Sequence, residues 1–349
     1  MVSQAVKVPK SGGFRMLKIA LLGCGRIGKM HAATIARSTK AQLIAVYDPI
    51  SSESEKLGAQ FACKVAKDAE EAILSSDAVL IATSTATHAD LIEIAVKAGK
   101  AVFCEKPIDL SLKRVEQCRA AIEGQAGVVQ IGFNRRFDPG HRAARDAARN
   151  GDVGDVQQVV ITSRDPGLAP WAYLEVSGGI FRDMTIHDFD LARFMLGEEI
   201  DEVFATGSAL IEPRLASELG DLDSIMVIMK TKSGKLCHIN NSRKATYGYD
   251  QRVEIFGSKG MVVSDNRRAH ELKRFGAETT DAAEPYLNFF IERYVEAFAA
   301  GLDSFIDKAI SGGTPDATFE DGFKALELAE AAVISASEKR FVKLSEIVR

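Results

Sequence analysis

A lysine and an aspartate–histidine pair are the residues of this chain whose types and spacing could do chemistry. Lys106 stands between Glu105 and Pro107, directly after an apolar segment, where its ammonium group could donate a hydrogen bond to a substrate oxygen. Asp183 and His187 are four residues apart, so one face of a predicted helix over 183–196 would present both groups. A histidine can take the proton of an alcohol while hydride leaves its carbon.

Each of these residues also has a structural explanation. Lys106 could be a surface lysine before a proline turn, and Asp183 could stabilise a helix N-terminus beside a core histidine. The Gly178-Gly179 pair upstream favours a helix start that faces a ligand. A metal site would need a third ligand; Asp188 and Asp190 are near in sequence, but no H-x-x-x-H pairing exists, so we predict no metal. The residues alone leave both explanations open.

Three further polar segments suit a substrate with several hydroxyl groups, because each hydroxyl both donates and accepts a hydrogen bond. They are the segment Asn-Arg-Arg-Phe-Asp that begins at Asn134, the segment Ser-Arg-Asp-Pro around Asp165, and the segment Tyr-Gly-Tyr-Asp around Tyr249. The alternatives are ordinary ones. Paired arginines usually form structural ion pairs, and Asp-Pro and Tyr-Gly are common in turns.

A glycine-rich turn near the start of the chain predicts a dinucleotide site. The apolar run 19–22 has the character of a buried parallel strand, and it leads into Gly23-Cys24-Gly25-Arg26-Ile27-Gly28, a G-x-G-x-x-G that opens a predicted helix over 26–37. Gly23 permits the tight turn, Gly25 lets backbone N–H groups approach a pyrophosphate, and Gly28 lets helix and strand pack closely. A second strand, 43–47, ends in Asp48, where an acid should bind the ribose hydroxyls.

The following segments alternate between strand and helix as far as residue 133. This alternation predicts an α/β fold with an N-terminal Rossmann domain, 16–133, built on a doubly wound parallel sheet. Ligands bind at the carboxyl ends of such strands, where Gly23, Asp48, the 83–88 loop and Glu105 with Lys106 all fall. Strand-like runs joined by short turns follow, so 134–349 is predicted to be an α/β domain with a largely antiparallel open sheet.

Composition excludes several classes of protein. The chain has 349 residues, a net charge of −4 and no strongly basic region, so we expect no nucleic-acid partner. No apolar run is long enough to span a membrane. Five scattered cysteines without a C-x-x-C pair favour a reducing, cytoplasmic setting. Residues 1–15 are polar and are interpreted as a disordered tail or a cloning remnant.

Taken together, these motifs resemble the Gfo/Idh/MocA oxidoreductases. The resemblance rests on the glycine-rich turn with His31, Asp48, the Glu-Lys-Pro run, and Asp183 with His187, and it covers nearly all of the chain from Met16. The segments 178–197 and 247–250 look like those of bacterial inositol 2-dehydrogenases.

The resemblance implies a role for each candidate residue. Lys106, Asp183 and His187 match the catalytic triad of the family. Asn134, Asp165 and Tyr249 would contact the substrate. Thr83, Ser84, His88 and Glu105 would line the cofactor cleft together with the glycine-rich turn and Lys106. In this family the second domain often assembles a homotetramer through its open sheet.

The resulting expectation is an NAD-dependent dehydrogenase that oxidises myo-inositol or a close cyclitol to a keto-inositol. Asp48 should repel the 2′-phosphate of NADP, and no arginine follows it to offset that charge. Two alternatives belong to the same family: a dehydrogenase or reductase of another sugar or polyol, and a non-catalytic NAD-sensing regulator. The regulator would normally lack the lysine–histidine pair that this chain keeps.

Overall fold

The computed structural model describes residues 16–125 and 127–347. The predicted tail, residues 1–15, lies outside the described residues. The chain forms two compact units: the first contains the described residues up to Gly132 together with Phe298–Phe323, and the second contains Phe133–Ala297 and the chain from Lys324 onward. Within the described ranges, no helix combines the length and the apolar character needed to cross a membrane.

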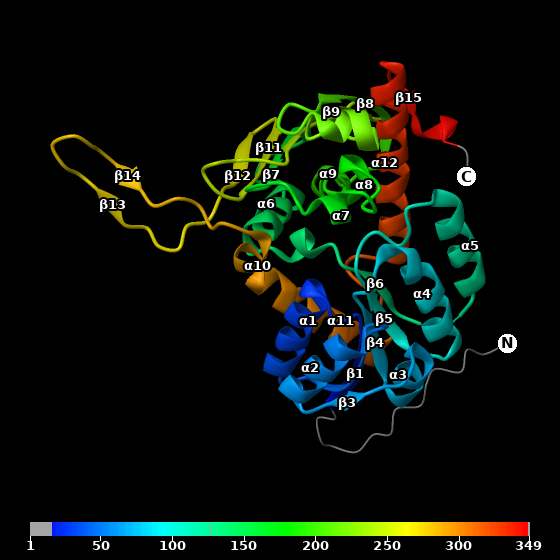
Figure 1. The fold of residues 1–349 in the computed structure, drawn as a ribbon. Coiled ribbons are helices and arrows are strands. Elements are labelled where there is room, and N and C mark those ends of the chain that lie inside the picture. The colour runs from blue at the N-terminus through cyan, green and yellow to red at the C-terminus, as the bar shows by residue number, and fades with distance from the viewer. Residues whose placement is uncertain (1–15, 126, 348–349) are drawn as a thin grey trace. The chain divides into compact units, whose positions relative to one another are not determined.

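The first unit is built on a six-stranded parallel sheet in the order β3-β2-β1-β4-β5-β6 (Figure 1). Its strands are β1 (Leu17–Leu22), β2 (Ala41–Tyr47), β3 (Lys64–Val65), β4 (Ala78–Ile81), β5 (Ala101–Cys104) and β6 (Val129–Ile131). The side chains of β4 are buried on both faces, which explains its continuous apolar sequence. The strand order reverses between β1 and β4, where such sheets bind their ligands. The predicted doubly wound parallel sheet is confirmed.

Helices cover both faces of this sheet. They are α1 (Arg26–Arg37), α2 (Ser51–Phe61), α3 (Ala69–Ser75), α4 (His88–Lys97) and α5 (Leu112–Ile122). The core on one face includes Ala32 and Ile35 of α1 and Leu57 of α2, packed with residues of β1 and β2. On the other face, α4 contacts both α3 and α5. Each helix therefore buries one apolar side against the sheet, and the strand ends remain as the place for polar loops.

A segment from the far end of the chain also belongs to the first unit. Helix α11 (Val295–Ser311) places Leu302, Phe305 and Ile306 in the core beside Phe103 of β5. The backbone also links this segment to the parallel sheet, since the Ile131 N–H of β6 donates to the Ala317 carbonyl at 2.9 Å. The sequence predicts that every residue after 133 belongs to the second domain. The segment 298–323 lies in the first unit instead, because its apolar residues complete the core of the parallel sheet.

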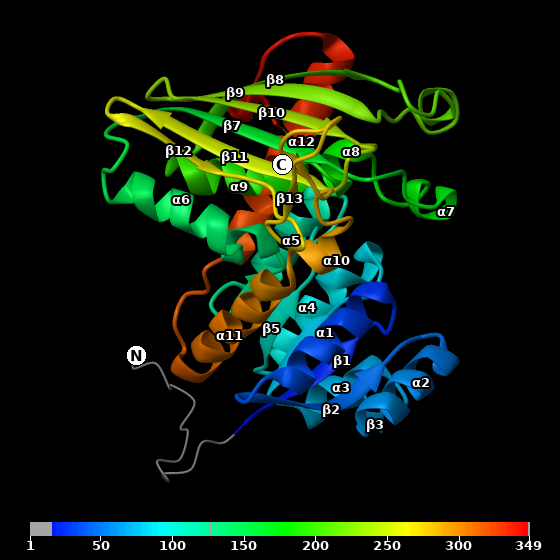
Figure 2. The same ribbon diagram turned by 90° about the vertical axis from the view of Figure 1, so that its left-hand side faces the viewer.

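The second unit contains a seven-stranded sheet in the order β12-β11-β7-β10-β9-β8-β15 (Figure 2). Its strands are β7 (Val156–Arg164), β8 (Ile200–Ser208), β9 (Ser224–Thr231), β10 (Leu236–Ser242), β11 (Asp250–Gly257), β12 (Gly260–Ser264) and β15 (Val342–Lys343). The β7–β10 pair is parallel, and the other neighbouring pairs are antiparallel. The predicted largely antiparallel open sheet is therefore confirmed.

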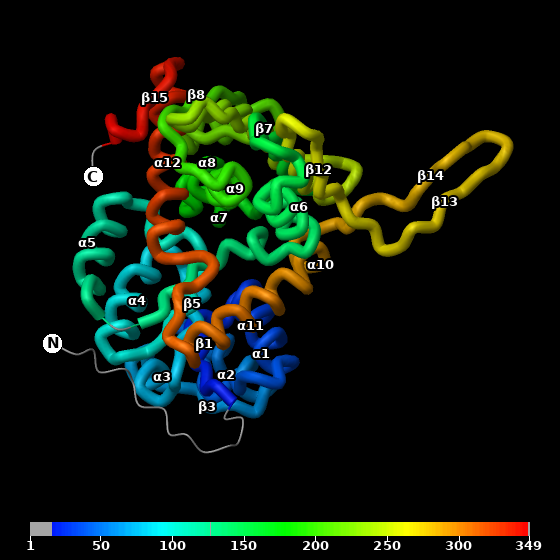
Figure 3. Tube along the Cα trace, turned by 180° about the vertical axis from the view of Figure 1, so that it is seen from behind, coloured from blue at the N-terminus to red at the C-terminus, as the bar shows by residue number. Residues whose placement is uncertain are grey.

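One face of this sheet is covered by helices. Helix α6 (Pro139–Arg149) contacts β11 and β12, and α9 (Ile186–Leu196) contacts β7 and β10. Shorter elements of the same unit are η2 (Asn134–Phe137), α7 (Trp171–Leu174), α8 (Ile180–Asp183), η3 (Leu215–Leu219), α10 (Phe290–Arg293) and η4 (Leu344–Glu346), and α12 (Phe319–Glu338) runs into the unit from the first. A hairpin of β13 (Lys273–Arg274) and β14 (Ala282–Ala283) extends away from this sheet (Figure 3).

The opposite face of the sheet carries exposed apolar side chains among polar ones such as Glu202, Lys230 and Glu254. Strand pairing aligns the outward residues: Ile228 is opposite Phe204 on one side and His238 on the other, and Phe256 is opposite Met261. This register puts the following exposed or half-exposed apolar side chains on one face: Phe204, Met226, Ile228, Leu236, Phe256, Met261 and Val263. We call this set the outer apolar face. Exposed apolar side chains gathered on one face of a sheet are typical of a protein–protein contact.

Candidate active site

The three glycines of the G-x-G-x-x-G each have a distinct steric reason. Gly23 has a φ of +96°, and a Cβ there would lie 2.4 Å from the Ala82 carbonyl oxygen. A Cβ on Gly28 would lie 1.9 Å from the Gly23 carbonyl oxygen, so helix and turn can pack this closely only without a side chain. A Cβ on Gly25 would meet nothing within 4 Å. Gly25 therefore borders open space at the start of α1, where a phosphate group could approach.

The start of α1 is suited to an anion. Gly25 is the N-cap and offers no side-chain cap, and the first turn contains no acidic residue. The backbone N–H groups of Arg26 and Ile27 begin the helix, so the positive end of its dipole faces outward with them. Such an N-terminus after a glycine-rich turn binds the pyrophosphate of dinucleotides.

Asp48 lies beside the glycine-rich turn, as its spacing predicted. Its Oδ2 accepts from the Cys24 N–H at 2.7 Å, and its Oδ1 accepts from the Ile50 N–H at 2.8 Å. Each carboxylate oxygen keeps a further lone pair, which two ribose hydroxyls could use. The next residues, Pro49 and Ile50, supply no cation.

The loops after β4 and β5 hold the other candidate cofactor residues. Thr83 is half-buried and Ser84 is exposed, whereas His88 is 1% exposed. The ring of His88 contacts two backbone carbonyls, with Nδ1 2.8 Å from the Pro107 oxygen and Nε2 3.1 Å from the Thr83 oxygen. Burial lowers the pKa of this imidazole. We infer that His88 joins the two loops, and that the loops themselves, not its ring, are available to a cofactor.

In the second unit, a buried carboxylate organises the site. Asp188 on α9 is fully buried and forms an ion pair with Arg135 of η2. It also accepts from the Ser163 hydroxyl at 2.6 Å and from the Asn241 amide at 2.9 Å. These partners come from β7 and β10, so one carboxylate joins two strand ends to the helix that carries His187.

The predicted helix over 183–196 is broken. Asp183 ends α8 and His187 lies in the first turn of α9, with Met184 and Thr185 between the two helices. The Thr185 N–H donates to the Ile180 carbonyl, and its hydroxyl donates to Asn241 Oδ1 at 2.7 Å. The His187 N–H donates to the Met184 carbonyl, so the simple i, i+4 ladder between Asp183 and His187 is interrupted. The cause is the tertiary contact at Thr185, which local spacing does not reveal.

Two residues that our sequence analysis missed hold the Asp183 carboxylate. Tyr173 Oη donates to Asp183 Oδ1 at 2.7 Å, and an Arg243 guanidinium nitrogen donates to Oδ2 at 3.0 Å. Arg243 is 2% exposed, and it also lies 3.5 Å from the Asp221 carboxylate. A buried arginine at a strand end has no local sequence signal, since arginines are usually exposed.

The three candidate substrate residues share an unusual property. Asn134 is 8% exposed, Tyr249 is 6% exposed and Asp165 is half-buried, yet among the described residues their side-chain polar groups have no hydrogen-bond partner. None of these polar atoms is among the fully buried unpaired ones of the described residues, so they border space that water or a ligand can reach. Tyr249 packs edge-to-face on Tyr294 and Phe289, which holds its ring in place. A hydroxylated ligand would supply the missing partners.

Electrostatics also distinguish Asp165 from an ordinary surface acid. Burial and the nearby Asp183 carboxylate raise its pKa to about 6, and the Arg135 and Arg243 guanidinium groups only partly offset this. The same burial raises the pKa of the Tyr249 hydroxyl well above its usual value. Asp165 can therefore act as a carboxylate acceptor or as a protonated donor near neutral pH.

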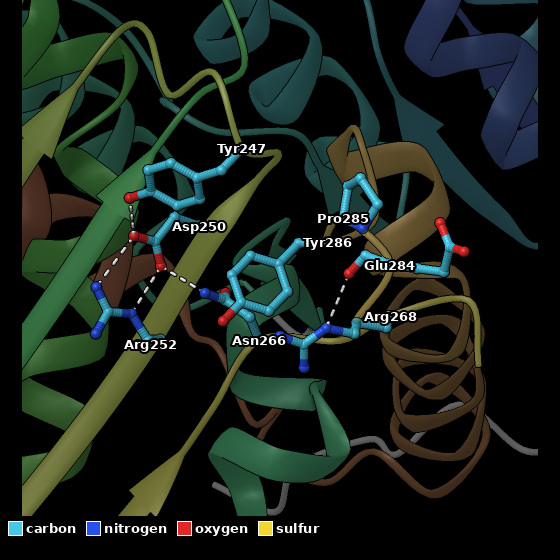
Figure 4. A pocket seen from close by; sticks show the side chains of 8 residues that line it. All are labelled: Tyr247, Asp250, Arg252, Asn266, Arg268, Glu284, Pro285 and Tyr286. Atoms are coloured by element: carbon cyan, nitrogen blue, oxygen red, sulfur yellow. Dashed lines mark hydrogen bonds and ion pairs between the residues drawn. The ribbon is translucent and has the colours of Figure 1, made fainter. Parts of the chain in front are cut away.

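The side chains of the segment 247–250 divide between two places. Tyr247 and Asp250 line a separate pocket of about 440 Å³ at the base of the hairpin, together with Arg252, Asn266, Arg268, Glu284, Pro285 and Tyr286 (Figure 4). There, Asp250 pairs with Arg252 and accepts from the Tyr247 hydroxyl at 2.6 Å. Tyr249 is absent from that pocket and lies in the aromatic cluster instead. Asp250 thus has a structural role.

The arginines after Asn134 form structural ion pairs. Arg135 pairs with Asp188, and Arg136 forms a bidentate pair with Asp190 at 2.6 and 2.8 Å. Over the described part of the chain, no group of three or more His, Cys, Asp or Glu side chains is arranged to hold a metal ion. Asp188 and Asp190, the nearest metal-ligand candidates, are thus engaged by guanidinium groups.

The candidate residues divide between the two units. Gly23 to Gly28, Asp48, Thr83, Ser84, Glu105 and Lys106 lie at the carboxyl ends of strands in the first unit. Asn134, Asp165, Asp183, His187 and Tyr249 lie in the second. Asp165 is electrostatically coupled to Asp183 and to Tyr249, so these three form one neighbourhood. The grouping of Lys106 with Asp183 and His187 stays a prediction.

Comparison with known proteins gives consistent matches. The model of an oxidoreductase family with an NAD-binding Rossmann fold matches residues 17–133, and the GFO/IDH/MocA C-terminal domain matches 141–263. The chain is 47% identical to the inositol 2-dehydrogenase of Rhizobium meliloti, over 94% of this chain and 99% of the relative.

Solved structures agree in fold. A myo-inositol dehydrogenase from Corynebacterium glutamicum superposes with a TM-score of 0.91 at 43% identity, covering 95% of this chain and 99% of that one. A scyllo-inositol dehydrogenase from Lactobacillus casei, solved with NAD(H) and scyllo-inositol, gives 0.88 at 29% identity, covering 95% and 100%.

Alanine substitutions separate the roles of two glycines. We expect Gly25→Ala to keep the melting temperature within about 1 °C of the wild type, but to weaken NAD+ binding about tenfold or more, because its methyl group enters open space at the helix start. Gly28→Ala should instead lower the free energy of unfolding by about 1–3 kcal/mol, and the melting temperature by several degrees, because its methyl group overlaps the Gly23 carbonyl. Calorimetry measures both effects, and wild-type NAD+ affinity in Gly25→Ala would contradict the assignment.

Neutralising Asp165 should stabilise the protein at alkaline pH. Its pKa is raised to about 6 in the folded chain, above the ordinary value of 3.8, so ionisation there disfavours folding as pH rises through this range. Asp165→Asn should therefore raise the free energy of unfolding by about 1–3 kcal/mol at pH 8 and by clearly less at pH 4.5. Melting temperatures at the two pH values measure this, with the exposed Asp155→Asn as control. An equal gain at both pH values would refute the stated cause.

Proposed function

This chain belongs to the Gfo/Idh/MocA oxidoreductase family and binds NAD, and from that membership we propose that it oxidises myo-inositol, or a close cyclitol, to a keto-inositol. The observation that carries the substrate class is the set of unpaired polar side chains in the second unit, Asn134, Asp165 and Tyr249. Together they offer an amide, a carboxyl and a phenol to neighbouring ring hydroxyls. Relatives named for inositol support the same class.

The proposed chemistry assigns one task to each group. NAD+ supplies the hydride acceptor when it is bound. His187 takes the proton from the substrate hydroxyl, which favours hydride loss from the same carbon. Lys106 donates a hydrogen bond to that oxygen and orients it. The Asp183 carboxylate, fixed by Tyr173 and Arg243, offers an acceptor to an adjacent hydroxyl or to the His187 ring.

Cofactor selectivity follows from Asp48. Its carboxylate is fixed by two backbone N–H groups next to the glycine-rich turn, so it cannot move away from an added charge without losing both bonds. The 2′-phosphate of NADP would stand near this carboxylate without a compensating arginine. We therefore propose a preference for NAD+ over NADP+.

A second substrate is favoured by a specific observation. One structural relative carries scyllo-inositol, whereas others are named for the myo isomer. The two isomers differ in the orientation of a single hydroxyl, so the same polar groups could bind either. A sugar or another polyol is the wider alternative within the family.

We also propose a homotetramer assembled through the outer apolar face. This face presents methionine, isoleucine, leucine, valine and phenylalanine side chains from five strands, β8 to β12. Exposed apolar side chains in such number are stabilised by burial against another copy, at about 25 cal/mol per Å². An isologous contact uses the same face on both partners.

The purified protein should form NADH from myo-inositol and NAD+. Absorbance at 340 nm would be followed with myo-, scyllo- and chiro-inositol and glucose, each with NAD+ and with NADP+. We expect myo-inositol with NAD+ to give the highest kcat/KM, and NADP+ to give at most about a hundredth of it because of Asp48. Activity on glucose alone would discard the proposed substrate while keeping the fold and cofactor.

Lys106→Ala serves as the matched test of the catalytic group in that assay. Its kcat should fall about 10²- to 10⁴-fold while NAD+ affinity stays near the wild-type value. The exposed Lys113→Ala, in the same unit, is the control and should keep full turnover. Substantial turnover in Lys106→Ala would remove this lysine from the mechanism.

A charge on the outer apolar face should dissociate the assembly. Wild-type protein should elute with four times the protomer mass of 37.8 kDa, and Ile228→Glu should elute as smaller species, because the carboxylate would be buried without a partner. Ile50→Glu, at another exposed isoleucine in the first unit, should leave the mass unchanged. Light scattering after gel filtration measures both, and an unchanged mass for Ile228→Glu would place the contact elsewhere.

A further inference from the structure

A buried histidine contacts the residue that precedes Lys106. His31 lies on α1, is 1% exposed, and has its Nε2 2.6 Å from Glu105 Oε1. Glu105 directly follows β5 and directly precedes Lys106. The chemistry proposed above uses neither side chain, so the pair requires its own explanation.

The surroundings of the ring define its proton arrangement. Phe103 and Phe298 pack edge-to-face on it at centroid distances of 5.4 and 5.7 Å. Among the described residues, its buried Nδ1 has no hydrogen-bond partner. If the neutral ring carried its proton on Nδ1, that buried N–H would have no acceptor, and the lone pair of Nε2 would face the Glu105 carboxylate. Both are unfavourable. The proton therefore lies on Nε2, and His31 donates to Glu105.

The Glu105 side chain has a dedicated space. A Cβ on Gly132 would lie 2.9 Å from Glu105 Oε2, so the carboxylate occupies room that a side chain at 132 would take. The backbone is fixed as well, since the Glu105 N–H donates to the Ile81 carbonyl at 2.9 Å and the Gly132 N–H donates to the Cys104 carbonyl at 2.8 Å. With residue 105 held at both backbone and side chain, Lys106 leaves the strand from a rigid base.

We propose that His31 is a positioning residue for the reaction: it holds the Glu105 carboxylate and, through it, the direction of the Lys106 side chain. The inference rests on the proposed role of Lys106. It also ties that lysine to α1, because His31 lies one turn after Gly28 on the helix whose start receives the pyrophosphate. One helix thereby aligns the cofactor site with the catalytic ammonium group.

Three variants test this role. His31→Leu replaces the donor by an apolar side chain of similar size. We therefore expect kcat to fall about 10- to 100-fold, while KM for NAD+ and for the polyol changes by less than about threefold. His31→Gln can place an amide N–H near the Nε2 position and should recover most of that loss. Glu105→Leu removes the acceptor, so it should lower kcat as His31→Leu does while the aromatic rings around His31 stay unchanged.

The double variant His31→Leu with Glu105→Leu decides whether the histidine acts through the glutamate. If it does, the double variant should be no slower than Glu105→Leu alone. Additive losses would overturn the proposal, as would wild-type kcat in His31→Leu. Equal losses in His31→Gln and His31→Leu at unchanged melting temperature would also overturn it, because the hydrogen bond would then not matter.

A second measurement separates this inference from the proposed substrate. The rate at which Lys106 is reductively methylated, read by peptide mass spectrometry, reports on its orientation without turnover. We expect a severalfold change in His31→Leu and a wild-type rate in His31→Gln, with Lys113 as the internal reference. Wild-type protein that is inactive on every polyol would reject the proposed function, whereas an unchanged Lys106 rate in His31→Leu would reject the positioning role.

Discussion

The second unit depends on the pairing of one fully buried carboxylate, Asp188. Burial raises its pKa, and the Arg135 guanidinium, the Ser163 hydroxyl and the Asn241 amide counter that cost. Removing Arg135 would leave the buried carboxylate without its counter-charge, which costs about 3–5 kcal/mol in comparable pairs. Four elements, η2, β7, α9 and β10, must therefore meet at this point. The position of His187, the residue before Asp188 on α9, follows from that meeting.

At two strand ends of the second unit, one residue bonds to structural partners and the residue next to it in the chain is a candidate ligand contact. Arg164 bonds to Asn240 and to the Tyr247 hydroxyl, whereas the next residue, Asp165, keeps its carboxyl group unpaired among the described residues. Tyr249 likewise keeps its hydroxyl unpaired, while the adjacent Asp250 is fully engaged by structural partners. Side chains alternate between the two faces of an extended chain, so a single strand end can contribute to the fold and to a binding surface at once.

In the first unit, the direction of the parallel strands positions the candidate cofactor residues. Parallel strands all end at one edge of the sheet, so strand direction brings the loops after β1, β2, β4 and β5 to that edge. Side-chain contacts then fix the loops: Asp48 bonds to the Cys24 N–H, and His88 joins the loops after β4 and β5. The sheet itself is completed by α11, whose apolar residues arrive from far along the chain.

Local chemistry in the sequence was sufficient for the parallel sheet, the glycine-rich turn and the place of Asp48, because periodicity, positive φ at Gly23 and motif spacing act within a few residues. Tertiary structure alone decided the break at Thr185, the pairing of Arg243 with Asp183, and the return of 298–323 to the first core. These features depend on partners such as Asn241, 56 residues from Thr185. No local pattern encodes such a contact, since its free energy exists only once the folded chain has brought both groups together and removed water from them.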